Sequence, residues 1–338
     1  MDKLRRHLME LAVGLAGTTL LLPLQSSIAA EEFLPQCAAS LKGCWQLARG
    51  KELALAEEML SAMLPELGRL AAQPSQYQQT AAGLAVQGKL LQAILAMHRL
   101  NFVARELYCL EAVQWGKVSG LPILEAAALC RLAHTYKSCP PQRPEKAVET
   151  YQAALSALGD KSFLVKSDIM MGLADAYAQC KEEQKALATI EAAKTHFPAH
   201  PEQDPSFLYT DCGRSNLYML EGQMYLELAQ HYPDRGYYQQ AYTVFAHGST
   251  VQSVADRITS ETLIRQADAA RGLRDLDLFA ACLKEGTRIA LALGSQKRYS
   301  EAWDVFQRTP QKWLHEQQIQ ELAQDIFKQP GGMLGSSL

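Results

Sequence analysis

The chain has 338 residues, of which 48% are hydrophobic and 20% are charged, so it is long and apolar enough to bury a large core. Its 33 basic and 36 acidic residues give a net charge of −3, which excludes non-specific nucleic-acid binding through a strongly basic surface. Alanine and leucine are frequent, and no segment shows the alternating Val, Ile and Thr residues of a strand. The composition therefore predicts an all-helical protein.

Residues 1–30 combine a basic start with a short apolar segment. Lys3, Arg5 and Arg6 come first, and an apolar run from Leu11 to Leu24 follows, interrupted by two glycines and a proline. The order fits a twin-arginine-like secretory signal, but the run is too short to span a bilayer comfortably. Two interpretations stay open: an exported or membrane-anchored protein, and a cytoplasmic protein that begins with a leader or linker helix.

From residue 31 to about residue 328 the periodicity predicts six to seven helical hairpins, followed by a disordered tail at 329–338. The predicted pairs are 33–48 with 51–72, 80–99 with 101–118, 124–139 with 144–158, 167–180 with 184–197, a fifth pair on either side of a long turn at 231–237, 257–273 with 275–293, and 297–308 with 312–327. The fifth pair carries Tyr218, Gly222, Tyr225, Ala241 and Phe245. A break at 201–215 separates the fourth pair from the fifth.

The stretch from Ser167 to His200 carries the clearest pattern. Two helix-period halves meet at the polar turn 181–183, and small residues at Ala174 and Ala186 allow two antiparallel helices to approach closely. Pro198 ends the second half because it lacks an N–H group. This 34-residue hairpin resembles the tetratricopeptide repeat (TPR). The resemblance implies a right-handed superhelix, an α-solenoid whose first helices line a concave face.

A wider resemblance covers residues 5–327. The Arg-Arg leader, the segment HYPDRGYYQQA at 231–241 and the segment LRDLDLF at 273–279 are similar to the TPR half of bacterial Xre-type transcriptional regulators. In that family a helix-turn-helix DNA-binding domain precedes the TPR half, which senses a ligand or mediates assembly. This chain begins at the position of the linker, so no residue is expected to bind DNA directly.

No pattern in the sequence predicts an enzyme or a metal site. The eight cysteines are scattered without a CxxC pair, which favours reduced packing residues over disulfides or zinc ligands. His196 and His200 have helix-like spacing, but Pro198 lies between them. Phosphate-loop, nucleophile-elbow and zinc-protease motifs are missing from the sequence, so no catalytic residue and no cofactor are predicted. Asp168 and Asp175, seven residues apart, fit solvated or groove-facing carboxylates.

The groove positions of the repeat supply the candidate partner-binding residues. Carried over from the TPR resemblance, they are Lys89, Met97, Cys130, His134, Lys137, Asp168, Met171, Asp175, Gln179, Asn216, Met219, Gln223, Glu227, Asp268 and Arg271. Mixed charge with methionines favours an extended peptide or a partner helix that has basic or hydrogen-bond-donating groups. Because the two aspartates are expected to be exposed, exchange of both for Lys is expected to change stability by less than about 0.5 kcal/mol.

Two functions stay open. The first is a non-enzymatic scaffold that binds a peptide or protein partner in its concave groove. The second is the sensor half of an Xre-type regulatory system that acts with a separate DNA-binding partner. A second copy of the chain is a further candidate partner, and membrane contact is expected only through residues 1–30, if the leader anchors the chain.

Overall fold

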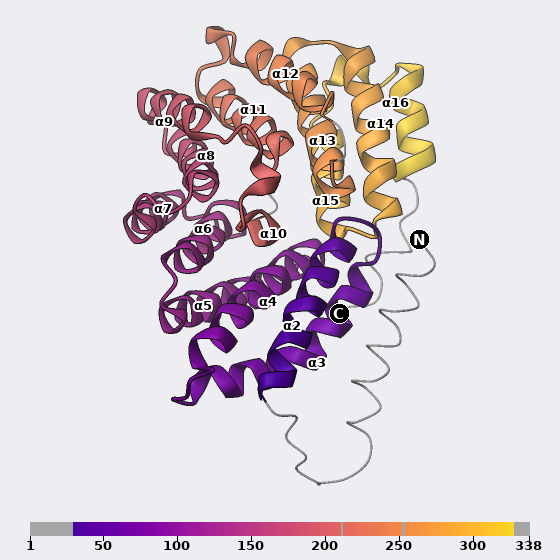
Figure 1. The fold of residues 1–338 in the computed structure, drawn as a ribbon. Helices are drawn as coiled ribbons and strands as arrows, with labels where there is room; N and C mark the ends of the chain where they lie inside the picture. The colour runs from indigo at the N-terminus through magenta and orange to yellow at the C-terminus, as the bar shows by residue number, and fades with distance from the viewer. Residues whose placement is uncertain (1–29, 211, 252–253, 328–338) are drawn as a thin grey trace.

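The computed structural model describes residues 30–210, 212–251 and 254–327 (Figure 1). These residues form fifteen α-helices joined by short turns, and no strand occurs among them. The all-helical prediction is thus confirmed for this part of the chain. The predicted leader falls almost wholly on residues 1–29, and the predicted tail on residues 329–338, so both lie outside the described residues.

The helices pack in consecutive pairs, in an α-solenoid-like arrangement. The first helices of the pairs are α2 (Ala30–Ala48), α4 (Gln78–His98), α6 (Pro122–Ser138), α8 (Phe163–Gln179), α11 (Arg214–His231), α13 (Asp256–Leu273) and α15 (Gln296–Gln307). The second helices are α3 (Leu53–Ala72), α5 (Phe102–Ser119), α7 (Pro144–Leu158), α9 (Glu183–His196), α12 (Tyr237–Gly248) and α14 (Leu276–Ala292). Two short helices remain, α10 (Phe207–Thr210) and α16 (Gln317–Leu322).

Side-chain caps explain several helix starts. The Ser162 hydroxyl accepts a hydrogen bond from the backbone N–H of Val165, and Asp275 and Ser295 cap α14 and α15 in the same way. The cap at Ser162 starts α8 four residues before the 34-residue repeat unit begins. Ser167, the first residue of that unit, therefore lies inside the helix, where its hydroxyl donates to the carbonyl of Ala193 at 2.9 Å.

Small residues allow the helices of neighbouring pairs to pack closely. Ala174 and Ala186, expected between two helices, are both completely buried. A Cβ atom added at Gly172 of α8 would lie 2.4 Å from the Tyr151 ring of α7, so only glycine fits there. Gly222 of α11 faces the Phe245 ring of α12 in the same manner, at 2.5 Å.

The array closes into a ring, which the sequence did not predict. The first helices contact one another in the order α4, α6, α8, α11, α13, α15, and α15 then contacts α4 (Figure 1). Where α4 and α15 meet, His98 Nδ1 and Ser295 Oγ are 2.7 Å apart and share a hydrogen bond.

The predicted break at 201–215 contains α10, which lies inside the ring (Figure 1). This short helix contacts α2, α4 and α8, and its Tyr209 packs into the core that α2, α3 and α4 share. The segment is thus a structural element of the ring interior and not a plain linker.

The last predicted helix, 312–327, is wrong as a single element. The structure has a 3-10 turn at Gln311–Trp313, then α16, then a π-helical turn at Ala323–Phe327. Trp313 is buried against Phe279, with ring centroids 5.5 Å apart, and this anchor interrupts the helix.

None of the eight cysteines forms a disulfide, and all but Cys180 are buried, as expected for packing residues. Among the described residues, α4 is the one helix long and apolar enough to cross a membrane. It lies in the ring with most of its apolar window buried, as a core helix of any folded protein would.

Candidate functional site

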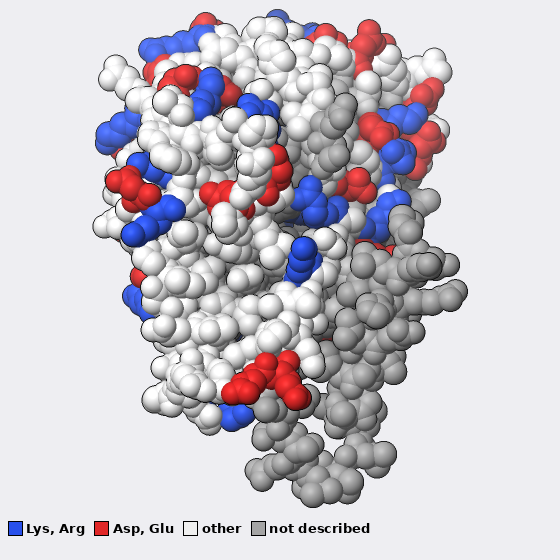
Figure 2. All heavy atoms as spheres, in the orientation of Figure 1, with Lys and Arg blue, Asp and Glu red and all other residues white. Residues whose placement is uncertain are grey.

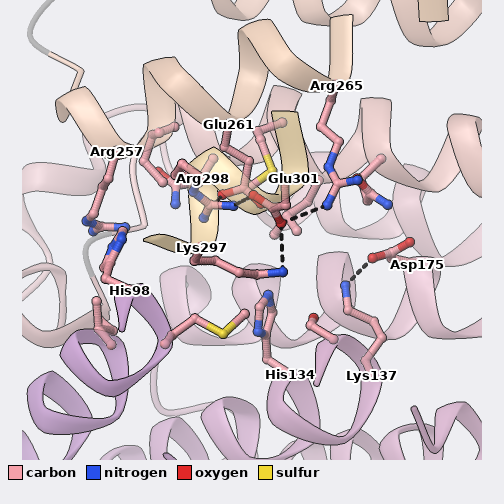
Figure 3. Close-up of a pocket in the computed structure, with 18 of the residues that line it drawn as sticks. His98, His134, Lys137, Asp175, Arg257, Glu261, Arg265, Lys297, Arg298 and Glu301 are labelled. Atoms are coloured by element: carbon pink, nitrogen blue, oxygen red, sulfur yellow. Dashed lines mark hydrogen bonds and ion pairs between the residues drawn. The ribbon is translucent and has the colours of Figure 1, made fainter. Parts of the chain in front are cut away.

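The ring encloses a polar cavity of about 290 Å³. The first helices α4, α6, α8, α11, α13 and α15 line it, together with Arg105 of α5 and Thr210 of α10. Figure 2 shows that basic and acidic residues border the central part of one face, whereas the region below carries few charges. Figure 3 shows charged side chains from opposite sides of the ring pointing toward one another across this cavity.

Many of the groove residues expected from the repeat line the cavity. They are Met97, His134, Lys137, Asp168, Asp175, Gln179, Asn216, Met219, Gln223 and Glu227. The repeat register therefore brings together side chains of α4, α6, α8 and α11 that are far apart in the sequence.

Lys89, Cys130 and Met171 are placed elsewhere. Lys89 forms an ion pair with Glu111 at 2.6 Å, outside the cavity lining. Met171 is completely buried in the core around α8, α9 and α11. Cys130 is buried behind the wall, where its thiol donates to Asp168 Oδ2 at 3.7 Å. Their expected groove-facing placement is wrong, because the helices of a closed ring bury part of each groove position.

Asp268 and Arg271 of α13 do not line the cavity either. They form an ion pair with each other at 2.7 Å, and Asp268 also binds Arg308 at 3.1 Å. The lining residues of α13 lie earlier on the helix, at positions 257, 258, 261 and 265. The expected residues on α13 therefore lie beyond the C-terminal end of the lining segment, the nearer of them three residues after Arg265.

Other charged lining residues were missed. They are His98, Arg105, Arg131, Arg257, Glu261, Arg265, Lys297, Arg298, Glu301, Asp304 and Arg308. A signal for part of this set exists in the sequence, because Arg257, Glu261 and Arg265 recur at four-residue spacing on one helix face. The contribution of α15 has no such local signal, because it depends on ring closure.

The α8 and α11 side of the cavity is acidic. Asp175 is completely buried and forms an ion pair with Lys137 of α6. The pKa of Glu227 rises from 4.5 to about 7, mainly because the carboxyl group is buried and secondly because the negative charge of Asp175 is close. Burial also raises the pKa of Asp168, although Arg131 opposes this. The expectation that both aspartates are exposed is wrong: Asp175 is completely buried and Asp168 is half-buried.

The α13 and α15 side holds a network of cations around one carboxylate. Glu301 binds Lys297 at 2.9 Å and Arg265 at 3.1 Å, and it also binds Arg298 (Figure 3). Burial alone would raise the pKa of Glu301, but these three cations hold it well below its ordinary range. Arg298 binds Glu261 as well. These pairs fix the cationic side chains in place at the cavity wall.

The two histidines at the cavity are neutral at physiological pH. Burial lowers the pKa of His134 well below its usual value, and the nearby cations Lys137 and Arg105 lower it further. Arg105 Nη2 donates to His134 Nδ1 at 2.9 Å, so His134 carries its proton on Nε2. Burial and the cation Arg298 similarly lower the pKa of His98.

Several buried polar atoms of the wall lack a hydrogen-bond partner among the described residues. Two are acceptors, Asp175 Oδ1 and Gln179 Oε1. Two are donors, the Nε–H groups of Arg265 and Arg298. Each unsatisfied buried group costs about 1–3 kcal/mol, which makes the cavity a place where a bound molecule would gain hydrogen bonds.

No group of three or more candidate metal ligands occurs in the part of the chain that the structure describes. The Cys130 thiol, which donates to Asp168 of the cavity wall, is protonated, because burial and the adjacent Asp168 raise its pKa well above its usual value. The arrangement is suited to binding a polar molecule. No family model matches this chain, and no curated protein matches it.

Proposed function

We propose that this protein is a non-enzymatic TPR-like scaffold that binds a peptide or protein partner through its concave face, at the central cavity. The observation that supports this function is the set of buried polar atoms without partners, which lie on both sides of one cavity. Native proteins satisfy nearly all buried polar groups, so a cluster of unsatisfied ones is typical of a site that awaits a ligand. The TPR resemblance of residues 167–200 agrees with such a role.

Affinity capture from the native host, followed by mass spectrometry of bound proteins and peptides, tests this proposal. A matched pair of variants makes it specific: Gln179→Ala changes the cavity wall, and Gln184→Ala changes an exposed position on the outer helix α9. We expect Gln179→Ala to weaken capture of the partner at least about tenfold, equivalent to about 1.4 kcal/mol, and Gln184→Ala to have no effect. Loss of capture in the outer variant alone would contradict a concave site.

The regulatory function is a second candidate, and the ring closure favours it. The contact between His98 and Ser295 joins α4 to α15, and both helices line the cavity. A ligand that contacts both helices would stabilise the closed ring, which is what a sensor requires. Recovery of a DNA-binding protein among the captured partners would support this candidate.

We also propose a cytoplasmic location, because free buried thiols suit a reducing compartment. Sequencing the N-terminus of the protein from its host tests this, since a mature chain that begins near residue 30 would indicate export.

A further inference from the structure

The cavity has two chemically opposite halves. The acidic half, on α8 and α11, contributes Asp168, Asp175 and Glu227 together with amide side chains, and none of its lining residues is Lys or Arg. The basic half, on α13 and α15, contributes Arg257, Arg265, Lys297 and Arg298, which outnumber its carboxylates Glu261, Glu301 and Asp304. Helices α8 and α15 lie three positions apart in the ring of six lining helices, so they face each other across the cavity, whereas α11 and α13 are neighbours.

The two halves also differ in the kind of polar atom that lacks a hydrogen-bond partner. In the acidic half Asp175 Oδ1 and Gln179 Oε1 accept no hydrogen bond, so this half lacks donors. In the basic half Glu261 and Glu301 bind the terminal nitrogens of Arg265 and Arg298, but the Nε–H groups of both arginines find no acceptor. A molecule with a donor group at one end and an acceptor group at the other would satisfy both.

Two further cations favour an anionic group in the ligand. Arg105 is 2% exposed, and its hydrogen-bond partners are neutral: Thr135 Oγ1 at 2.8 Å and His134 Nδ1 at 2.9 Å. Neither Arg105 nor Arg131 forms an ion pair with a carboxylate within the described ranges, although Arg131 is half-buried and its charge acts on Asp168. A buried cation such as Arg105 without a counter-ion is costly, and an anion in the cavity would offset that cost.

We propose that the cavity binds a small zwitterion, a free amino acid or a dipeptide. Its ammonium group would donate to Asp175 and Gln179, and its carboxylate would accept from the arginines of the basic half. The volume of about 290 Å³ equals the share of roughly ten waters in the liquid, so a ligand of about ten non-hydrogen atoms fits. This proposal rests on the proposed binding function and refines it. The bound peptide must be short enough for its ammonium and its carboxylate groups to lie in the cavity together.

Thermal unfolding of the full chain with defined compounds tests the proposal. The probes are L-alanyl-L-alanine and each common free amino acid at about 10 mM, because bound ligand stabilises the folded state by mass action. Matched controls carry an N-acetyl group or a C-terminal amide, and inorganic phosphate tests a response to anions alone. We expect at least one unblocked compound to raise the Tm, and either blocking group to weaken its binding at least about tenfold. The dipeptide and amino-acid arms decide the length of the ligand.

A variant pair locates the binding. Gln179→Leu removes an acceptor that has no partner, so the protein should still fold, and it should weaken the best zwitterion at least about tenfold. Gln184→Leu on the outer helix should leave its affinity unchanged. The proposal is overturned if no unblocked compound raises the Tm, if blocked compounds or phosphate act equally well, or if Gln179→Leu folds and binds normally. If none of these compounds binds but a protein partner is still captured, the zwitterion proposal is wrong and the proposed scaffold function remains.

Discussion

Lys137 and Asp175 form an ion pair in the cavity wall, and their side chains are 3% and 1% exposed. Because Asp175→Asn leaves the Lys137 ammonium buried without its counter-charge, we expect it to lower the free energy of unfolding by about 3–5 kcal/mol. Chemical denaturation at neutral pH measures this loss. The double variant Lys137→Met with Asp175→Leu should recover most of it, since neither position then carries a charge that needs a partner. If Asp175→Asn leaves the free energy of unfolding unchanged, the ion pair is not buried.

Glu227 gives the cavity a pH dependence. Its pKa rises from 4.5 to about 7 in the folded protein, through burial and the charge of Asp175, while Arg265 and Lys137 oppose the rise. Between about pH 4.5 and pH 7 the folded state therefore binds a proton that the unfolded state has released. The stabilisation due to this proton is lost as the pH rises through that window.

Glu227→Gln tests this dependence because it removes the titration and keeps the shape. The stability of the wild type relative to Glu227→Gln should fall as the pH rises from about 5 to about 8, as measured by denaturation at several pH values. A difference that does not change with pH would show that Glu227 ionises as an exposed carboxylate does, and one that favours the wild type more as the pH rises would show that folding lowers its pKa.

At the scale of helices, glycines set how closely neighbouring helices approach. A methyl group at position 222 would lie 2.5 Å from the Phe245 ring, so Gly222→Ala should overpack the contact between α11 and α12 and cost about 1–3 kcal/mol. Gly68 on α3 is a matched control, because nothing lies within 4 Å of its added Cβ. Gly68→Ala should stabilise by about 0.5–1 kcal/mol. Thermal unfolding measures the stability of both variants. Equal changes in stability for Gly222→Ala and Gly68→Ala would contradict close packing of α11 against α12.

The sequence predicts the helices well where they pair locally. The predicted second helix of the third pair, 144–158, matches α7 because Pro144 marks its start and Gly159 its end. The short α10 was missed, since four residues carry no measurable periodicity and its position depends on contacts with α2 and α4. Helix α8 starts earlier than the repeat unit because Ser162 provides a cap that the repeat pattern does not include.

The sequence predicts the candidate site only in part, because local patterns do not show how the ring closes. The repeat spacing identifies lining positions on α6, α8 and α11, because there the local register and the ring agree. It does not identify Lys297 or Arg298, which reach the cavity only because α15 closes against α4. A contact such as that between His98 and Ser295 joins residues 197 positions apart, and no local pattern encodes it.

At the scale of the whole molecule, the structure turns an expected open groove into a ring with an enclosed interior. The charged side chains that would line an open groove instead face one another across a cavity of about 290 Å³. Burial away from bulk water strengthens the interactions of these charges and makes unsatisfied groups costly. The interior is therefore the surface where a partner gains most, and the second helices form an outer wall.

Hydrogen–deuterium exchange with and without the captured partner tests this central claim most directly. The account predicts slower exchange of backbone amides in α8, α11 and α13 when the partner is bound, and little change in α9, α12 and α14. Slower exchange confined to α9, α12 and α14, with α8, α11 and α13 unchanged, would contradict binding in the central cavity.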